Sequence, residues 1–149
     1  MNNSYKTNFQ KVIEFHDAFE VDPVGMSPGL RLKLILEEAG EVAEATVKME
    51  ETGGYEETGA LVKELCDLLY VTYGFLDLLG VDADVAFDIV HESNMSKLDE
   101  NGKPILREDG KILKGPNYKP VDPIDLLDAS DCLPEDDEFS GVLFKGKVS

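Results

Sequence analysis

The sequence predicts an all-α fold, more specifically an antiparallel four-helix bundle with short loops. Three observations lead to this prediction. Apolar residues recur at helical spacing in four segments, glycine and proline punctuate the joints between them, and no alternating strand pattern interrupts the series. A chain of 149 residues is long enough for one domain with a real core but too short for two.

The four predicted helices are bounded by local signals in the sequence. Ser27-Pro28 is typical of an N-cap followed by proline in the first turn. Gly53-Gly54 ends the second helix, and Gly80 stops the third. The expected spans are about Asn8–Glu20, Pro28–Glu50, Glu56–Leu79 and Asp82–Lys97.

The character of the chain changes after the fourth helix. In KPILREDGKILKG, two short apolar pieces flank Asp109-Gly110, which predicts a short C-terminal β-hairpin. From residue 121 onward the chain is acidic and punctuated by proline, as in VDPIDLLDASDCLPEDDE, and we expect a loosely ordered tail there. The predicted organisation is therefore one domain over residues 1–120 and an acidic tail over residues 121–149.

The charge of the chain limits its partners. A net charge of −17 argues against binding to nucleic acid or to an anionic membrane, because both would be repelled. No apolar run approaches the roughly 20 residues of a membrane span, and MNNSYKTNFQ lacks the apolar core of a signal peptide. Cys66 and Cys132 have no metal-type spacing, so we expect reduced thiols in a cytoplasmic protein.

Carboxylates follow the apolar lines of the second and third helices. In LILEEAGEVAEA, Glu38 and Glu41 lie on a line that begins and ends with apolar residues. In ELCDLLYV, Glu64 shares its line with leucine and valine, and Asp67 is one turn further on. Two such helices packed antiparallel would bring four or five acids together.

Most glutamates on helices are solvated surface groups, and any one of these residues alone would be read that way. The whole set is harder to explain as solvated surface groups, because two like charges 5 Å apart cost about 3 kcal/mol at an effective dielectric near 20. No lysine or arginine lies on the same lines, so either protonation or a divalent cation must relieve the repulsion. Oxygen ligands favour magnesium, manganese or calcium, and magnesium usually binds phosphate-bearing substrates as well. Neither a Glu-x-x-His pair nor an EF-hand loop is present.

These motifs resemble those of the MazG-type all-α nucleotide pyrophosphohydrolases, which are related to phosphoribosyl-ATP pyrophosphohydrolase and to dimeric dUTPases. The resemblance rests first on Glu37-Glu38-Ala39-Gly40-Glu41 and Glu64-Leu65-Cys66-Asp67, in that order. HESNMSK and DGKILKGPNY, further along the chain, are similar to one MazG-like subgroup. The resemblance covers roughly residues 9–120.

The resemblance implies magnesium-dependent hydrolysis of a nucleoside triphosphate between its α and β phosphates, with manganese as a possible substitute. Glu37 and Glu38 would be catalytic, with Glu37 orienting the attacking water or helping to hold a further metal. The implied metal ligands are Glu38, Glu41, Glu64 and Asp67, and the implied substrate contacts are Asn94, Lys97, Lys114 and Tyr118.

Related enzymes build their pockets across subunits, and four short helices leave apolar faces uncovered, so a homodimer or higher homo-oligomer is expected. Removal of unwanted nucleotides from the cellular pool would be the purpose. Two alternatives remain open. The substrate could be phosphoribosyl-ATP, as in histidine biosynthesis, or the chain could be a non-catalytic acidic bundle that binds metal or nucleotide.

Overall fold

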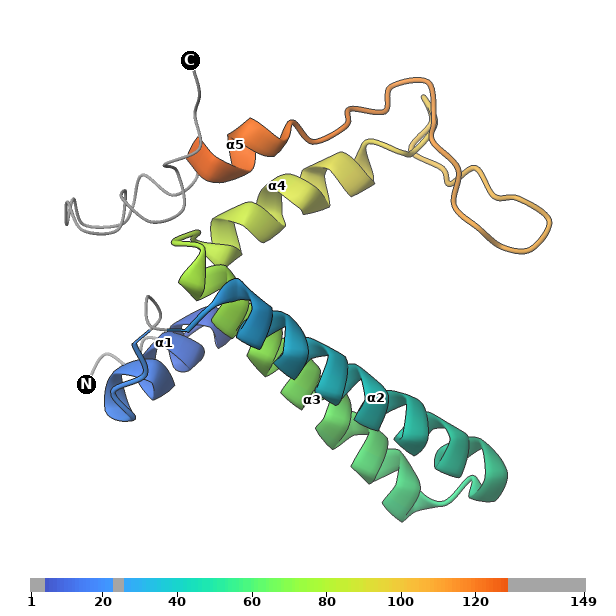
Figure 1. Ribbon diagram of the computed structural model, residues 1–149. Helices are drawn as coiled ribbons and strands as arrows, with labels where there is room; N and C mark the ends of the chain where they lie inside the picture. Colours follow the sequence, from blue (N-terminus) through green and yellow to red (C-terminus); the bar gives the residue numbers. More distant parts are fainter. Residues whose placement is uncertain (1–4, 23–25, 129–149) are drawn as a thin grey trace. The chain divides into compact units, whose positions relative to one another are not determined.

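The computed structural model describes residues 5–22 and 26–128. Within these residues the chain is helical and has no named β-strand, which confirms the all-α class. Each predicted helix is present, with ends close to the expected ones, and a short fifth helix follows (Figure 1). The observed helices are α1 (Asn8–Ala18), α2 (Pro28–Thr52), α3 (Tyr55–Leu78), α4 (Ala83–Met95) and α5 (Pro123–Asp128).

Side-chain caps explain where several helices begin. Thr7 and Gln10 form a reciprocal capping box at the start of α1. The Ser27 hydroxyl accepts a hydrogen bond from the Leu30 amide at 3.2 Å, as the Ser27-Pro28 signal predicts. At the other end of α2, Gly53 adopts the left-handed conformation (φ 61°) that ends a helix at little cost for glycine.

The chain divides into two compact units at Gly80, and each is described here by itself. The first unit holds α1, α2 and α3, and the second holds α4 and α5. The four-helix bundle therefore stays a prediction, because its fourth helix belongs to the second unit. The predicted boundary at residue 120 also stays a prediction. Part of the expected tail is helical, as α5, and residues 129–149 lie outside the described residues.

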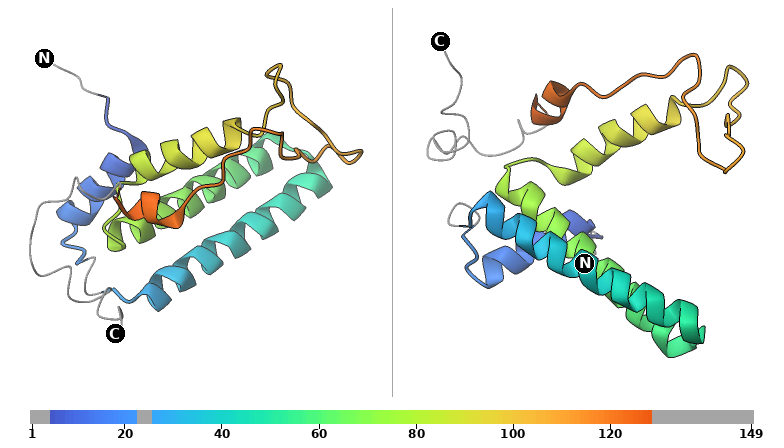
Figure 2. Two further views of the ribbon diagram at one scale, coloured as in Figure 1. Left: turned by 90° about the horizontal axis from the view of Figure 1, so that it is seen from above. Right: turned by 45° about the vertical axis from the view of Figure 1, so that its right-hand side comes forward.

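In the first unit, α2 and α3 run antiparallel side by side as a long hairpin (Figure 2). Aromatic contacts pack α1 onto α3: the Phe9 and Tyr73 rings lie 6.2 Å apart, and Phe15 meets Tyr70 edge-on at 5.6 Å. Val12, with 1% of its surface exposed, completes this core. None of the helices in the described part of the chain is both long and apolar enough to span a membrane.

A buried polar cluster joins the three helices at one end of the hairpin. His16 of α1 pairs with Asp77 of α3, with 2.5 Å between Nδ1 and Oδ2. Arg31 of α2 is only 4% exposed, and burial lowers its pKa while the nearby Asp77 charge opposes that shift. A Cβ on Gly74 would lie 2.7 Å from the Arg31 Nη1 atom, so glycine leaves the room that the guanidinium fills.

In the second unit, a segment over residues 115–121 is held against α4 and the turn that follows it. The Ser93 hydroxyl donates to the Lys119 carbonyl at 2.7 Å, and the Lys119 amide donates to the Ser96 hydroxyl at 2.8 Å. The Gly115 amide donates to the Lys97 carbonyl at 2.9 Å. These bonds fix the path of the segment although it has no regular secondary structure of its own.

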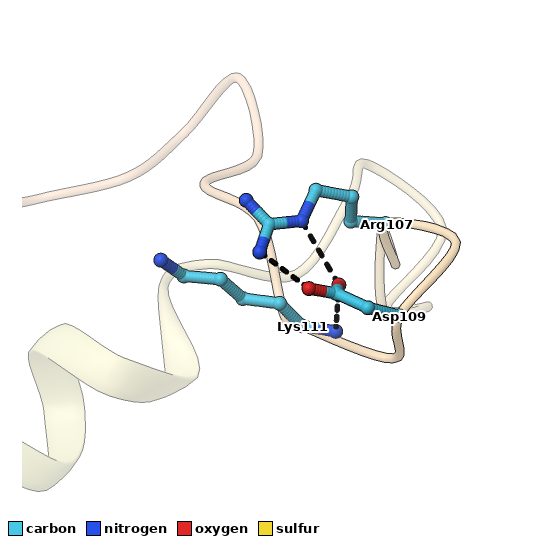
Figure 3. Close-up of polar contacts among 3 residues, drawn as sticks. All are labelled: Arg107, Asp109 and Lys111. Atoms are coloured by element: carbon cyan, nitrogen blue, oxygen red, sulfur yellow. Dashed lines mark hydrogen bonds and ion pairs between the residues drawn. The ribbon is translucent and has the colours of Figure 1, made fainter.

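The predicted C-terminal β-hairpin is wrong: within the described residues this region forms a single antiparallel bridge, Leu106 to Ile112, and no strand. Its turn is closed by the Arg107–Asp109 ion pair, and the Lys111 amide donates to the Asp109 carboxylate at 3.1 Å (Figure 3). Leu106 and Ile112, paired across the bridge, are 56% and 59% exposed, so the face of the ribbon that they share is not buried. A two-stranded ribbon without a packed face does not lengthen, because its local hydrogen bonds alone are marginal in water.

Gly115→Ala should destabilise the second unit. A Cβ at this position would lie 2.4 Å from the Leu98 carbonyl oxygen and 2.6 Å from that of Lys97, so the backbone must shift. We expect a loss of about 1–3 kcal/mol in the free energy of unfolding, measured by urea denaturation. Gly59→Ala is the matched control, because nothing lies within 4 Å of the added carbon; it should be neutral or stabilising. Equal stability of Gly115→Ala and the wild type would contradict this packing.

Candidate metal centre

The predicted acids of α2 and α3 meet along the seam of the hairpin. Among the described residues, Glu38, Glu41 and Glu64 each offer one carboxylate oxygen, and these oxygens all lie within 4.8 Å of one another. Glu38 and Glu64 are half-buried, whereas Glu41 is exposed. We call these three residues the acidic trio. The helical spacing that placed two of them on one line of α2 therefore corresponds to a real cluster with α3.

A hollow of about 260 Å³ opens between the two helices at this point. It is lined by Glu41, Glu44, Ala45, Lys48, Glu57, Ala60 and Glu64. Small alanine side chains on both helices leave the hollow open, and the acids give it a negative wall. The site is thus a groove on the hairpin and belongs wholly to the first unit.

The charges of the acidic trio repel one another. The pKa of Glu41 is raised, first because its carboxyl group hydrogen-bonds to Glu64, and then because Glu38 and Glu64 place negative charge beside it. A proton held between Glu41 and Glu64 is one way for the cluster to lower its charge. The other predicted remedy is a bound cation, which would have to displace that proton.

A lysine that the sequence analysis did not place at the site stands beside the acidic trio. Lys63 Nζ lies 3.0 Å from Glu64 Oε2 and 2.9 Å from Asp67 Oδ2. No lysine or arginine lies on the apolar lines of these acids, yet Lys63 reaches two of them. Lys63 is off the apolar line of α3 by one residue, but its long stem brings the ammonium group back to it.

Two predicted residues lie outside the acidic trio. Asp67, predicted as a metal ligand, is held by Lys63 in an i,i+4 ion pair. Glu37, predicted as catalytic, has a side chain that is 54% exposed and pairs loosely with Lys33 at 3.6 Å. Of the predicted metal ligands, the structure thus brings three together and places the fourth beside them through Lys63.

The four predicted substrate contacts belong to the second unit and form two pairs. Lys97 Nζ donates to Asn94 Oδ1 at 2.6 Å, just beyond the end of α4. Lys114 Nζ lies 4.4 Å from the centre of the Tyr118 ring, a cation–π contact. In each pair the neighbouring side chain, Asn94 or Tyr118, holds the lysine ammonium in position.

The acidic trio fits a hard divalent cation. Its donors are all carboxylate oxygens, which magnesium, manganese and calcium prefer. Neighbouring ligands of an octahedral magnesium ion lie about 3.0 Å apart, so three oxygens within 4.8 Å of one another would have to move closer together to share one ion. The acidic trio supplies three carboxylates, which leaves coordination positions for water or substrate oxygens.

Comparison with known proteins agrees with this geometry. The model of the phosphoribosyl-ATP pyrophosphohydrolase family matches residues 9–94, more than half of the chain. The chain belongs to this family. The match includes both acidic motifs and ends at Asn94, so the segment with Lys97, Lys114 and Tyr118 lies outside it. No curated protein matches the chain.

Membership confirms the suspected relation to the MazG-like enzymes and identifies a nucleotide pyrophosphohydrolase in general terms. Phosphoribosyl-ATP pyrophosphohydrolases depend on divalent metal in general, and the acidic trio is the part of this chain suited to hold it. The family match alone names neither the nucleotide that this chain hydrolyses nor the metal.

Glu41→Gln should stabilise the metal-free protein at neutral pH. Because the folded state raises the pKa of Glu41, it binds that proton more tightly than the unfolded chain does. The resulting stabilisation is complete below the ordinary carboxyl pKa and is lost as pH rises through the raised value. In EDTA, the Tm of Glu41→Gln should therefore exceed that of the wild type at pH 7.5 and match it near pH 4.

Glu50→Gln is the control, since Glu50 is an exposed residue of α2 outside the hollow. It should follow the wild type at both pH values. A difference for Glu41→Gln that is the same at pH 4 and pH 7.5 would show that charge repulsion is not its cause.

Proposed function

We propose that the protein is a magnesium-dependent (deoxy)nucleoside triphosphate pyrophosphohydrolase that releases a monophosphate and pyrophosphate. The observation that carries the proposal is the convergence of Glu38, Glu41 and Glu64 on one point of the α2–α3 groove. Asp67 completes the ligand set once it leaves Lys63. Manganese would serve in place of magnesium, because both accept carboxylate oxygens.

A divalent cation in this groove would neutralise charge on the phosphate oxygens and make a neighbouring water more acidic. The chain's own groups would do the rest. Glu38 belongs to the acidic trio and Glu37 precedes it on α2, and either carboxylate would accept a proton from the attacking water. Glu37 suits this role because its exposed side chain is only loosely paired with Lys33. Glu38 suits the binding role because it is half-buried within the acidic trio.

Positive and aromatic groups of the second unit would bind the substrate. Asn94 and Lys97 offer a donor pair, and Lys97 is held in place by its 2.6 Å hydrogen bond. Lys114 and Tyr118 offer a charge and a ring held in contact with each other. A triphosphate needs such cations because a −17 protein otherwise repels it.

A homodimer is part of the proposal, because the hairpin carries uncovered apolar residues at helical spacing. On α2, Leu32 and Leu36 are 51% and 64% exposed, and on α3, Val62, Leu65 and Leu69 are 55%, 44% and 53% exposed. Stripes of this spacing pack in bundles and are costly to leave in water. Two hairpins that meet through these residues would form a four-helix arrangement.

Phosphoribosyl-ATP is the second candidate substrate, because the matching family is described by its hydrolysis. The segments HESNMSK and DGKILKGPNY favour the MazG-like group and thus a role in cleansing the nucleotide pool. A panel of canonical and noncanonical triphosphates together with phosphoribosyl-ATP, assayed with magnesium for pyrophosphate and for phosphate, separates the two. Highest kcat/KM for phosphoribosyl-ATP would reject the preferred substrate class but keep the reaction.

Glu38→Gln and Glu64→Gln should each lower pyrophosphate release by roughly a hundredfold or more while the helices stay folded. Each change removes one negative ligand from the acidic trio and keeps its shape. The measurement is release of pyrophosphate from the best triphosphate of the panel, with helix content followed by circular dichroism. Glu50→Gln removes a charge from α2 without touching the groove and should keep full activity. Unchanged turnover in both groove variants would refute the enzymatic assignment and favour a non-catalytic binding protein.

Leu36→Glu and Leu65→Glu should shift the protein from dimer to monomer, because each places a charge in the proposed helical interface. Light scattering after gel filtration should give twice the 16.4 kDa chain mass for the wild type and the single mass for the variants. Leu106→Glu, at an exposed site of the bridge region, should stay dimeric. A wild type of single chain mass at micromolar concentration would exclude the dimer.

A further inference from the structure

Lys63 stands in direct contact with two of the acids that the proposed cation would use. Its ammonium lies between Glu64 Oε2, at 3.0 Å, and Asp67 Oδ2, at 2.9 Å. Hydrogen bonds to Asp67 and then to Glu64 hold the pKa of Lys63 above its usual range, so the group is charged at any working pH. The lysine side chain is 62% exposed, whereas that of Glu64 is only 16% exposed.

Glu64 is therefore shared between two cation positions. One of its oxygens belongs to the acidic trio, within 4.8 Å of oxygens from Glu38 and Glu41. Its Oε2 atom accepts from Lys63. A divalent ion bound to this carboxylate at a normal distance of about 2.1 Å would lie next to the ammonium and would be repelled by it.

The same contact explains why Asp67 does not join the acidic trio. Its carboxylate is turned to Lys63 in the i,i+4 pair on α3. If the ammonium withdraws, Asp67 loses its partner and gains the freedom to face a cation beside Glu64. Since the lysine side chain is mostly exposed and flexible, withdrawal into water is easy.

We propose that Lys63 is a resident counter-ion of the acidic groove that exchanges with the divalent cation. With Lys63 in place, the ammonium holds Glu64 and Asp67; on cation binding it leaves and both carboxylates turn to the ion. Lys63 is thus a positioning residue that sets the apparent affinity of the site for metal. The exchange requires a cation site at the acidic trio, and to that extent rests on the proposed function, but it needs no hydrolysis of a nucleotide.

Calorimetric titration of the full chain with Mn²⁺ and with Mg²⁺, at low ionic strength and without nucleotide, tests the exchange. Lys63→Met should bind each ion about tenfold more tightly than the wild type, a difference of about 1.4 kcal/mol. Lys63→Arg keeps the charge and should stay near the wild-type value. Lys6→Met is the matched control, because this substitution removes the same unit of positive charge. Lys6 also forms a comparable exposed ion pair, with Glu14 of α1 at 2.7 Å.

Tighter binding in Lys63→Met but not in Lys6→Met supports the exchange. Unchanged or weaker binding in Lys63→Met overturns it, and so does equal tightening in the Lys6 control, which would point to net charge alone. Lys63→Gln is titrated in parallel, with helix content checked, so that poor folding of one neutral variant does not decide the result. If the wild type and all variants bind neither ion, the metal site itself is refuted, which is a distinct failure.

Discussion

Repulsion among carboxylates in the seam between α2 and α3 is the constraint on which the site depends. Packing of the two helices places carboxylate oxygens of Glu38, Glu41 and Glu64 within 4.8 Å of one another, so their charges repel. Two contacts reduce this repulsion: a hydrogen bond between Glu41 and Glu64, and the ion pair between the Lys63 ammonium and Glu64. Both contacts are reversible, because one proton and one exposed side chain are easily displaced. A groove in which the repulsion is only partly relieved in this way remains receptive to a divalent cation.

The rest of the hairpin keeps that seam in register. At one end, Arg31 fills the space beside Gly74, and Asp77 joins α3 to His16 of α1. These buried polar contacts tolerate little sliding of one helix along the other, because a shifted Arg31 would lose the gap that receives it. The relation to phosphoribosyl-ATP pyrophosphohydrolases agrees with a scaffold of this kind, in which helix packing presents a fixed set of acids to a phosphate-bearing substrate.

Local signals made the helices predictable from the sequence, and the failures came where tertiary packing decides. Ser27-Pro28 marked the start of α2, because capping involves only neighbouring residues. The same kind of signal, Asp122-Pro123, starts α5, where the Asp122 carboxylate accepts from the Ile124 amide at 2.9 Å, but the acidic context hid it. The prediction of a β-hairpin around Asp109 was wrong, because a turn sequence does not reveal whether its flanking residues pack against another surface. Helical periodicity placed the acids on facing lines, and the i,i+4 spacing of Lys63 and Asp67 was also readable from the sequence. Periodicity could not show that the flexible stem of Lys63 brings the ammonium to Glu64 as well.

Anomalous X-ray diffraction from crystals grown with Mn²⁺ tests the central claim most directly, because it locates the ion without reference to activity. We expect an anomalous peak in the α2–α3 groove within bonding distance of Glu38, Glu41 and Glu64, with Asp67 turned toward it and Lys63 turned away. A peak elsewhere, or none at saturating Mn²⁺, with the three glutamates directed into solvent, would contradict it.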